Sequence, residues 1–131
     1  MTHNQIAFAF DQCQKALQAL TLIVNKPTTD DRAYIDATIQ RFEFTIELFW
    51  KLLKKILQNK GVYVIYPKDV IQKAYEGKLI DNEELWLAMI YDRNMSSHTY
   101  NQDLADDIYA RIKTYVPELI KQLNALQTYL S

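Results

Sequence analysis

The feature that most constrains the fold of this chain is a long run of apolar residues with helical spacing. Between residues 35 and 56, apolar side chains recur at alternating steps of four and three: Ile35, Ile39, Phe42, Ile46, Phe49, Leu53 and Ile56. Four more apolar residues widen this stripe well beyond a single seam: Phe44, Leu48, Trp50 and Leu52. A helix that is apolar over so much of its circumference needs neighbours on more than one side. We therefore expect this segment to be the central helix of the protein.

Two other long segments have the same periodicity. The first forms one stripe with Ile6, Phe10, Cys13, Leu17, Leu20 and Val24. Asn25-Lys26-Pro27 should end that helix, because proline cannot continue it. The last forms a stripe with Leu104, Ile108, Ile112, Tyr115, Leu119, Leu123, Leu126 and Leu130. Asn101 and Asp103 suit its start, and Pro117 should kink it or break it into two pieces.

Two shorter helices are expected between the long ones. Pro67 is well placed to open the first, whose inward residues would be Val70, Ile71, Ala74 and Tyr75, with Gly77 near its end. Asp81 or Asn82 would cap the second, which carries Leu85, Trp86, Met89 and Ile90. Residues 62–65 have the composition of a strand, but no second strand is available to pair with them. We expect an extended connection there instead.

Several residues are candidates for the ends of the central helix. Thr28, Thr29 and Asp30 are candidate N-caps, because their side-chain oxygens can accept a hydrogen bond from a free backbone N–H. Asn59-Lys60-Gly61 has the composition of a C-terminal stop. The sequence thus predicts an all-α protein, an antiparallel up-and-down bundle of three long helices and two short ones.

Composition supports this fold class and narrows the environment. The chain has 131 residues with only two glycines and three prolines, so we expect one helical domain over residues 1–131. The single Cys13 excludes an internal disulfide. No signal peptide or membrane-length apolar run is evident, so we expect a cytoplasmic protein without membrane contact. The net charge of −1 gives no general attraction to nucleic acid, so any RNA would need a local site.

One short stretch gathers three side chains with distinct chemistry: Arg93-Asn94-Met95-Ser96-Ser97-His98-Thr99-Tyr100. A histidine can exchange a proton near neutral pH. An arginine can grip a phosphate with two parallel hydrogen bonds. A tyrosine offers a hydroxyl that can itself be a substrate. We therefore place the candidate functional site in this stretch.

Each of these residues also has a purely structural interpretation. His98 would be an N-terminal cap or a surface histidine before the last helix. Arg93 would complement the C-terminal end of the preceding helix, or pair with Asp92. Tyr100 would be a packing aromatic with its hydroxyl at the surface. Ser96 and Ser97 are expected to be cap and turn residues rather than nucleophiles, since no base other than His98 is evident.

The motif resembles the R-x4-6-H motif of HEPN domains, in particular the R-x4-H-x-Y form of the toxins in HEPN/MNT toxin–antitoxin pairs. These toxins belong to the nucleotidyltransferase substrate-binding protein family. The resemblance extends over roughly residues 30–110, through four stretches: residues 36–45, residues 47–51, residues 66–75 with Gly77 and Ile80, and residues 86–87 leading into 92–94 and 97–101.

The resemblance implies a HEPN fold, a homodimer and a separate partner with a minimal nucleotidyltransferase fold. The implied activity is metal-independent RNA cleavage in which His98 transfers protons, Arg93 holds the phosphate and Asn94 donates a hydrogen bond or orients the pair. In this family the partner transfers AMP to the tyrosine, here Tyr100. No DNA substrate and no cofactor are implied. The alternative is a non-catalytic subunit that presents substrate to a nucleotidyltransferase.

Other patterns in the sequence are weaker. Glu43 and Glu47 share a helix face, but the chain has no Glu-x-x-His step, so we expect no di-iron site or other metal. It has no glycine-rich phosphate loop either. A cluster of lysines late in the central helix is either a solvated face or a guide for RNA or an acidic partner: Lys51, Lys54, Lys55 and Lys60. The tryptophans and most tyrosines are expected in the core.

Overall fold

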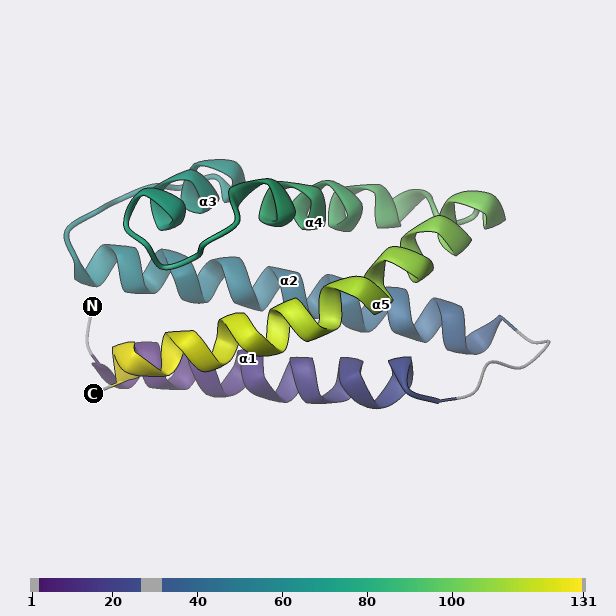
Figure 1. Ribbon diagram of the computed structural model, residues 1–131, viewed down its shortest axis with the longest axis horizontal. Coiled ribbons are helices and arrows are strands. Elements are labelled where there is room, and N and C mark those ends of the chain that lie inside the picture. The colour runs from purple at the N-terminus through teal and green to yellow at the C-terminus, as the bar shows by residue number, and fades with distance from the viewer. Residues whose placement is uncertain (1–2, 27–31, 131) are drawn as a thin grey trace.

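The computed structural model describes residues 3–26 and 32–130, and these residues form helices without a β-strand (Figure 1). The α-helices are α1 (His3–Val24), α2 (Ala33–Asn59), α3 (Pro67–Glu76), α4 (Glu83–Met95) and α5 (Gln102–Ala125). Two short 3₁₀ helices, η1 (Ser96–His98) and η2 (Leu126–Leu130), follow α4 and α5. The prediction of an all-α fold with three long and two short helices is confirmed.

The helices run up and down in sequence order (Figure 1). α1 and α2 are antiparallel neighbours, α3 and α4 follow one another along a third track, and α5 returns obliquely across the bundle. α2 contacts α1, α3, α4 and α5, as expected for a helix that is apolar on several sides. The candidate motif lies where α4 turns into α5, at one end of the bundle.

The core is built from the predicted stripes. Phe42 and Phe49 of α2 are fully buried, and their rings lie 5.8 Å from Tyr115 and 5.0 Å from Trp86 respectively. Burial of each such side chain stabilises the fold by roughly 1.5–3 kcal/mol. These aromatic contacts link α2 to both α4 and α5.

Three expectations about aromatic residues were wrong or incomplete. Phe44 is 57 % exposed, because none of the helices in the described parts of the chain covers that side of α2. Tyr75, expected to point inward, is also exposed. Trp86 is buried as expected and Trp50 is half-buried, but only two of the nine tyrosines are buried, Tyr109 and Tyr115. A phenol hydroxyl favours contact with water, so helical spacing overestimates the burial of tyrosine.

Most helix ends follow from local sequence. Asn82 and Asn101 cap α4 and α5, accepting hydrogen bonds from the backbone N–H groups of residues 85 and 104. Pro67 opens α3 as its first residue. The segment after α2 has no strand, and Val62 and Val64 pack partly against the core. α5 continues through Pro117 without breaking. The candidate caps Thr28, Thr29 and Asp30 lie outside the described residues, and the residue before α2 is Arg32.

α2 and α3 end in the same hydrogen-bonded motif but differ at its critical position. After α2, the N–H groups of Gly61 and Val62 donate to the carbonyls of Gln58 and Leu57, and Gly61 has φ +86°. After α3, the equivalent left-handed position is occupied by Lys78, with φ +65°. Gly77, expected near this end, precedes it by one residue. A side chain in the left-handed region is strained, whereas glycine is not.

Lys78→Gly is therefore expected to stabilise the protein by about 0.5–1 kcal/mol, since relief of strain outweighs the added freedom of the unfolded chain. The matched opposite change, Gly61→Ala, should destabilise it by about 1 kcal/mol or more. An added Cβ at Gly61 meets nothing within 4 Å, so this change tests the backbone alone. Urea unfolding of both variants measures the difference. Shifts of the midpoint in the same direction would contradict this account.

Candidate active site at the corner between α4 and α5

The motif occupies the last turn of α4, the η1 turn and the residues that lead into α5. Arg93 and Asn94 lie in the last turn of α4, His98 ends η1, and Tyr100 precedes the cap of α5. Asn94, His98 and Tyr100 are exposed, and the Arg93 side chain is 38 % exposed. The stretch therefore presents its polar groups at the surface of one corner of the bundle.

Serine and threonine hydroxyls hold this corner in shape. Ser96 Oγ donates to the carbonyl of Arg93, Ser97 Oγ donates to that of Asn94 at 3.2 Å, and Thr99 Oγ1 donates to that of Ser96 at 2.9 Å. Such bonds satisfy the carbonyls that a helix end leaves without partners. The expected turn role of Ser96 and Ser97 is thus confirmed.

His98 and Tyr100 lie side by side at the surface. Their ring centroids are 6.1 Å apart and the planes meet at 80°, an edge-to-face contact. Tyr100 is 85 % exposed, so its ring is largely in contact with water and not packed with only the hydroxyl at the surface, as the structural interpretation had it. His98 is not the cap of α5, because Asn101 takes that place. Both side chains are accessible to a partner or a substrate.

Arg93 is held by the central helix. Its Nη2 lies 3.1 Å from Glu47 Oε2, which also accepts a hydrogen bond from Trp50 Nε1 at 3.1 Å. Lys51 Nζ lies 3.3 Å from Glu47 Oε1. Arg93 Nε is buried and makes no hydrogen bond. Glu47 thus orients the Arg93 guanidinium, and the N–H groups of its Nη atoms that do not face Glu47 remain to meet an anion.

Glu47 stays ionised in this setting. Its partial burial works toward a higher pKa, but the hydrogen bonds from Trp50 and Lys51 and the charges of Arg93 and Lys51 outweigh burial and lower the pKa. The sequence predicted the pair of Glu47 and Lys51 but missed the link to Arg93. No spacing rule joins residues on two separate helices, so local sequence carries no signal for that contact.

Asp92 does not pair with Arg93, contrary to one of the interpretations above. Its carboxylate is only 2 % exposed and faces α5, where Arg111 and Tyr115 donate hydrogen bonds to it. Consecutive residues of a helix lie about 100° apart around its axis, so Asp92 and Arg93 point to different neighbours. Sequence reasoning did not assign a role to either α5 residue in this site.

Other candidate groups do not join this corner. No group of three or more His, Cys, Asp or Glu side chains suited to a metal occurs within the described parts of the chain. The Cys13 thiol is buried, and burial raises its pKa well above the usual range, so it is a poor nucleophile. In the predicted lysine cluster, Lys51 pairs with Glu47 and Lys60 lies over the Tyr129 ring, and both lysines are exposed.

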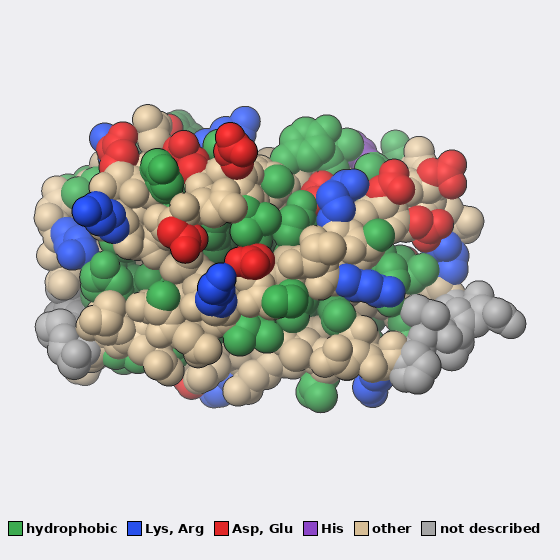
Figure 2. All heavy atoms as spheres, viewed as in Figure 1, with side chains coloured by type: hydrophobic (Ala, Val, Ile, Leu, Met, Phe, Trp, Pro, Cys, Tyr) green, Lys and Arg blue, Asp and Glu red, His purple; other side chains and the backbone are tan. Residues whose placement is uncertain are grey.

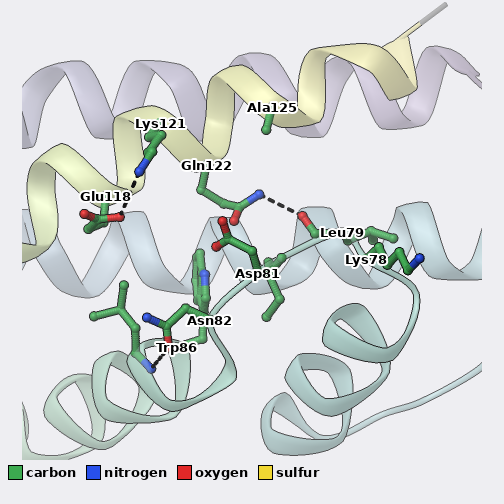
Figure 3. Close-up of a pocket in the computed structure, with 11 residues that line it drawn as sticks. Lys78, Leu79, Asp81, Asn82, Trp86, Glu118, Lys121, Gln122 and Ala125 are labelled. Atoms are coloured by element: carbon green, nitrogen blue, oxygen red, sulfur yellow. Dashed lines mark hydrogen bonds and ion pairs between the residues drawn. The ribbon is translucent and has the colours of Figure 1, made fainter.

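A cavity of about 200 Å³ lies elsewhere, between the α3–α4 connection and the second half of α5 (Figure 3). Trp86 and Gln122 are among its lining residues, and Gln122 Nε2 donates to the Leu79 carbonyl at 2.7 Å. No residue of the motif lines this cavity. The candidate site at the corner is therefore separate from this cavity.

The fold and the motif together define an all-helical protein of the HEPN class. The model of one family, described as nucleotidyltransferase substrate binding protein like, matches residues 8–128. The chain belongs to this family, and the resemblance found in the sequence is confirmed.

Named relatives agree with this membership. The chain is 33 % identical over 114 residues to a protein of Haemophilus influenzae named probable ribonuclease HepT, covering 79 % of this chain and 77 % of that protein. The fold of this chain is similar to that of a crystal structure from Thermus thermophilus, with a TM-score of 0.77, 37 % identity, and 85 % and 94 % of the two chains covered.

A second solved structure is HI0074 of Haemophilus influenzae, described as revealing the fold of a substrate binding domain of a nucleotidyltransferase. The TM-score is 0.68 at 28 % identity, with 96 % of this chain and 99 % of that chain covered. The helices of this chain offer no candidate for a membrane span within residues 3–26 and 32–130.

Proposed function

We propose that this protein is a toxin-type RNA endonuclease that needs no metal and is silenced when a partner nucleotidyltransferase transfers AMP to Tyr100. The observation that carries the proposal is the corner where Arg93, His98 and Tyr100 follow one another on a hydrogen-bonded turn at the surface. The similarity to a probable ribonuclease supports it. The residues proposed to act in cleavage are Arg93, Asn94 and His98.

Metal-independent RNA cleavage needs only a group that transfers protons and groups that stabilise the charge on the phosphate. The RNA 2′-oxygen loses its proton and bonds to the neighbouring phosphorus, while the bond from phosphorus to the 5′-oxygen breaks and that oxygen gains a proton. His98 is the proton-transfer group in this proposal. Arg93 stabilises the charge that grows on the phosphate, and Asn94 donates a hydrogen bond to it or orients the other two.

A homodimer completes this site. A single His98 would have to act first as base and then as acid, whereas two chains that join at this corner supply two histidines and two arginines. Apolar side chains lie near the corner on the exposed face of α4, where Tyr91 and Leu87 are about two and three turns before His98. Hydrophobic side chains also gather over the α4 edge of the surface (Figure 2). Such exposure supports an interface.

The same corner explains the proposed silencing. An adenylate ester on the Tyr100 hydroxyl would place a bulky, negatively charged group beside His98. It would block the approach of an RNA phosphate and compete for the Arg93 guanidinium. The 85 % exposure of Tyr100 supports its accessibility to a nucleotidyltransferase.

The second candidate is a non-catalytic subunit that binds substrate for a nucleotidyltransferase. The description of the solved HI0074 structure favours it, and so does the family description. The net charge of −1 and the ion pair between Arg93 and Glu47 also leave little positive charge at the corner to attract RNA. In this case the motif would bind and no RNA would be cut.

Expression without the partner nucleotidyltransferase separates the two. Wild type and His98→Ala are induced in cells that lack the partner, and growth and RNA integrity are recorded. Growth arrest with RNA breakdown for wild type alone is the expected result. Normal growth with intact RNA for both proteins, present as folded dimers, would favour the binding subunit.

A further inference from the structure

Asp92 is the single charged side chain in the buried core of the described residues. Its carboxylate accepts three hydrogen bonds from α5. Arg111 Nε lies 2.8 Å from Oδ2, Arg111 Nη2 lies 2.9 Å from Oδ1, and the Tyr115 hydroxyl lies 2.6 Å from Oδ2. The bidentate hydrogen bonds from Arg111 leave the Asp92 carboxylate little freedom to rotate.

The network connects three helices at the start of the motif. Tyr115 is buried and stacks on Phe42 of α2 with a ring separation of 5.8 Å. Through its hydroxyl it reaches Asp92 of α4. The next residue, Arg93, is tied to α2 from another side through Glu47. The last turn of α4 is therefore held by α5 and α2 together, immediately before the turn that carries His98.

Stability alone is a poor explanation for this arrangement. The Asp92 carboxylate loses its hydration on burial, whereas the Arg111 side chain stays 45 % exposed, so water partly screens the attraction between the two charges. Well-packed apolar residues in place of a buried charge with its partner are often as stable or more so. Hydrogen bonds have a preferred direction, so this network also fixes the orientation of the last turn of α4. A shift of about 1 Å in a catalytic group can cost about a hundredfold in rate, so orientation matters at this place in the chain.

We propose that Asp92, Arg111 and Tyr115 form a positioning network that sets the orientation of Arg93 and His98 toward the RNA phosphate. None of the three touches the substrate in this account. The inference rests on the proposed ribonuclease function, which it extends to three residues outside the motif of Arg, His and Tyr. It accounts for a buried charge that the motif chemistry does not use.

Two substitutions keep the size of the side chain. Asp92→Asn removes the charge of the carboxylate, and Tyr115→Phe removes the hydroxyl that donates to it. Each is expected to lower kcat for RNA cleavage about ten- to a hundredfold with little change in KM, measured well below the melting temperature of each variant. Asp106→Asn is the matched control. Asp106 lies near the start of α5 and pairs with Arg32 at 2.8 Å, not with a residue of α4. Its cleavage rate should equal that of wild type.

A triple variant separates positioning from stability: Asp92→Leu, Arg111→Met and Tyr115→Phe replace the network with apolar groups. A melting temperature near that of wild type with strongly reduced kcat is expected. Wild-type kcat in this stable variant, or in folded Asp92→Asn and Tyr115→Phe, would overturn the proposal.

Backbone amide NMR shifts give a readout that does not depend on cleavage. Tyr115→Phe should shift or broaden the signals of residues 93–100 and leave those of α1 unchanged. Unchanged signals over residues 93–100 would refute the positioning role. If wild type cuts no RNA, the proposed function fails, and the NMR result still decides whether the network orients the motif.

Discussion

Replacement of His98 by alanine is expected to lower the rate of RNA cleavage by at least about a hundredfold, because the reaction loses its proton-transfer group. The fold should be unaffected. His98 is exposed, and its side chain makes one ring contact, with Tyr100, so its loss should change the free energy of unfolding by less than about 0.5 kcal/mol. Cleavage of a labelled RNA by purified, unmodified protein measures the effect, with urea unfolding as the test of folding.

Arg93 gives an independent test of the same site. Arg93→Ala should reduce cleavage about a hundredfold or more, since a preorganised donor to the phosphate is lost. Arg93→Lys keeps the charge but not the planar fork, so it should recover only part of the rate. Glu47 keeps Trp50 and Lys51 as partners in both variants, which limits the cost in stability.

Ser97→Ala is the control for both substitutions. Ser97 is exposed on the same turn, and its hydroxyl donates to the Asn94 carbonyl at 3.2 Å. Its cleavage rate should stay within a few-fold of wild type, because one exposed hydrogen bond of the turn is lost while those of Ser96 and Thr99 remain. Full activity in either His98→Ala or Arg93→Ala would show that the catalytic assignment is wrong.

Replacement of Tyr100 by phenylalanine is expected to abolish AMP transfer and leave the protein toxic in the presence of its partner. The variant lacks only the acceptor oxygen, and the edge-to-face contact with His98 can persist. Cleavage by the unmodified variant should therefore stay close to that of wild type. Mass spectrometry after incubation with the nucleotidyltransferase and ATP measures the loss of modification.

Tyr91→Phe is the matched control for this prediction. Tyr91 is also an exposed tyrosine, and it lies on α4 before the motif. Its variant should still gain one adenylate per chain and lose its cleavage activity on modification. If the Tyr100→Phe variant still gained an adenylate, or if the Tyr91→Phe variant gained none, Tyr100 would not be the acceptor of AMP.

The parts of the fold that depend on near neighbours in the chain could be predicted from sequence. The spacing of Phe42, Phe49 and Leu53 places them on the same buried side of α2, and all three are buried. Asn82 caps its helix through a bond to a residue three positions later. The composition of residues 59–61 predicted the end of α2, since glycine readily adopts positive φ.

Contacts between helices were not predictable in the same way. Asp92 and Arg93 are neighbours in sequence, and one structural interpretation of the sequence paired them as opposite charges. In the fold, Asp92 binds Arg111 and Tyr115 of α5, and Arg93 binds Glu47 of α2. Phe44 fits the apolar stripe, yet its side chain is exposed. Periodicity defines a face of a helix but does not say which neighbour covers that face.

The sequence by itself thus determined the helices, the caps of α4 and α5, and the order of Arg93, Asn94, His98 and Tyr100 along one connection, because these features depend on spacings within a few turns. The tertiary structure alone decided that Glu47 holds Arg93, that Asp92 faces inward, and that His98 and Tyr100 share an open corner. The physical reason is that each depends on how separate helices pack, which buries some faces and leaves others in water.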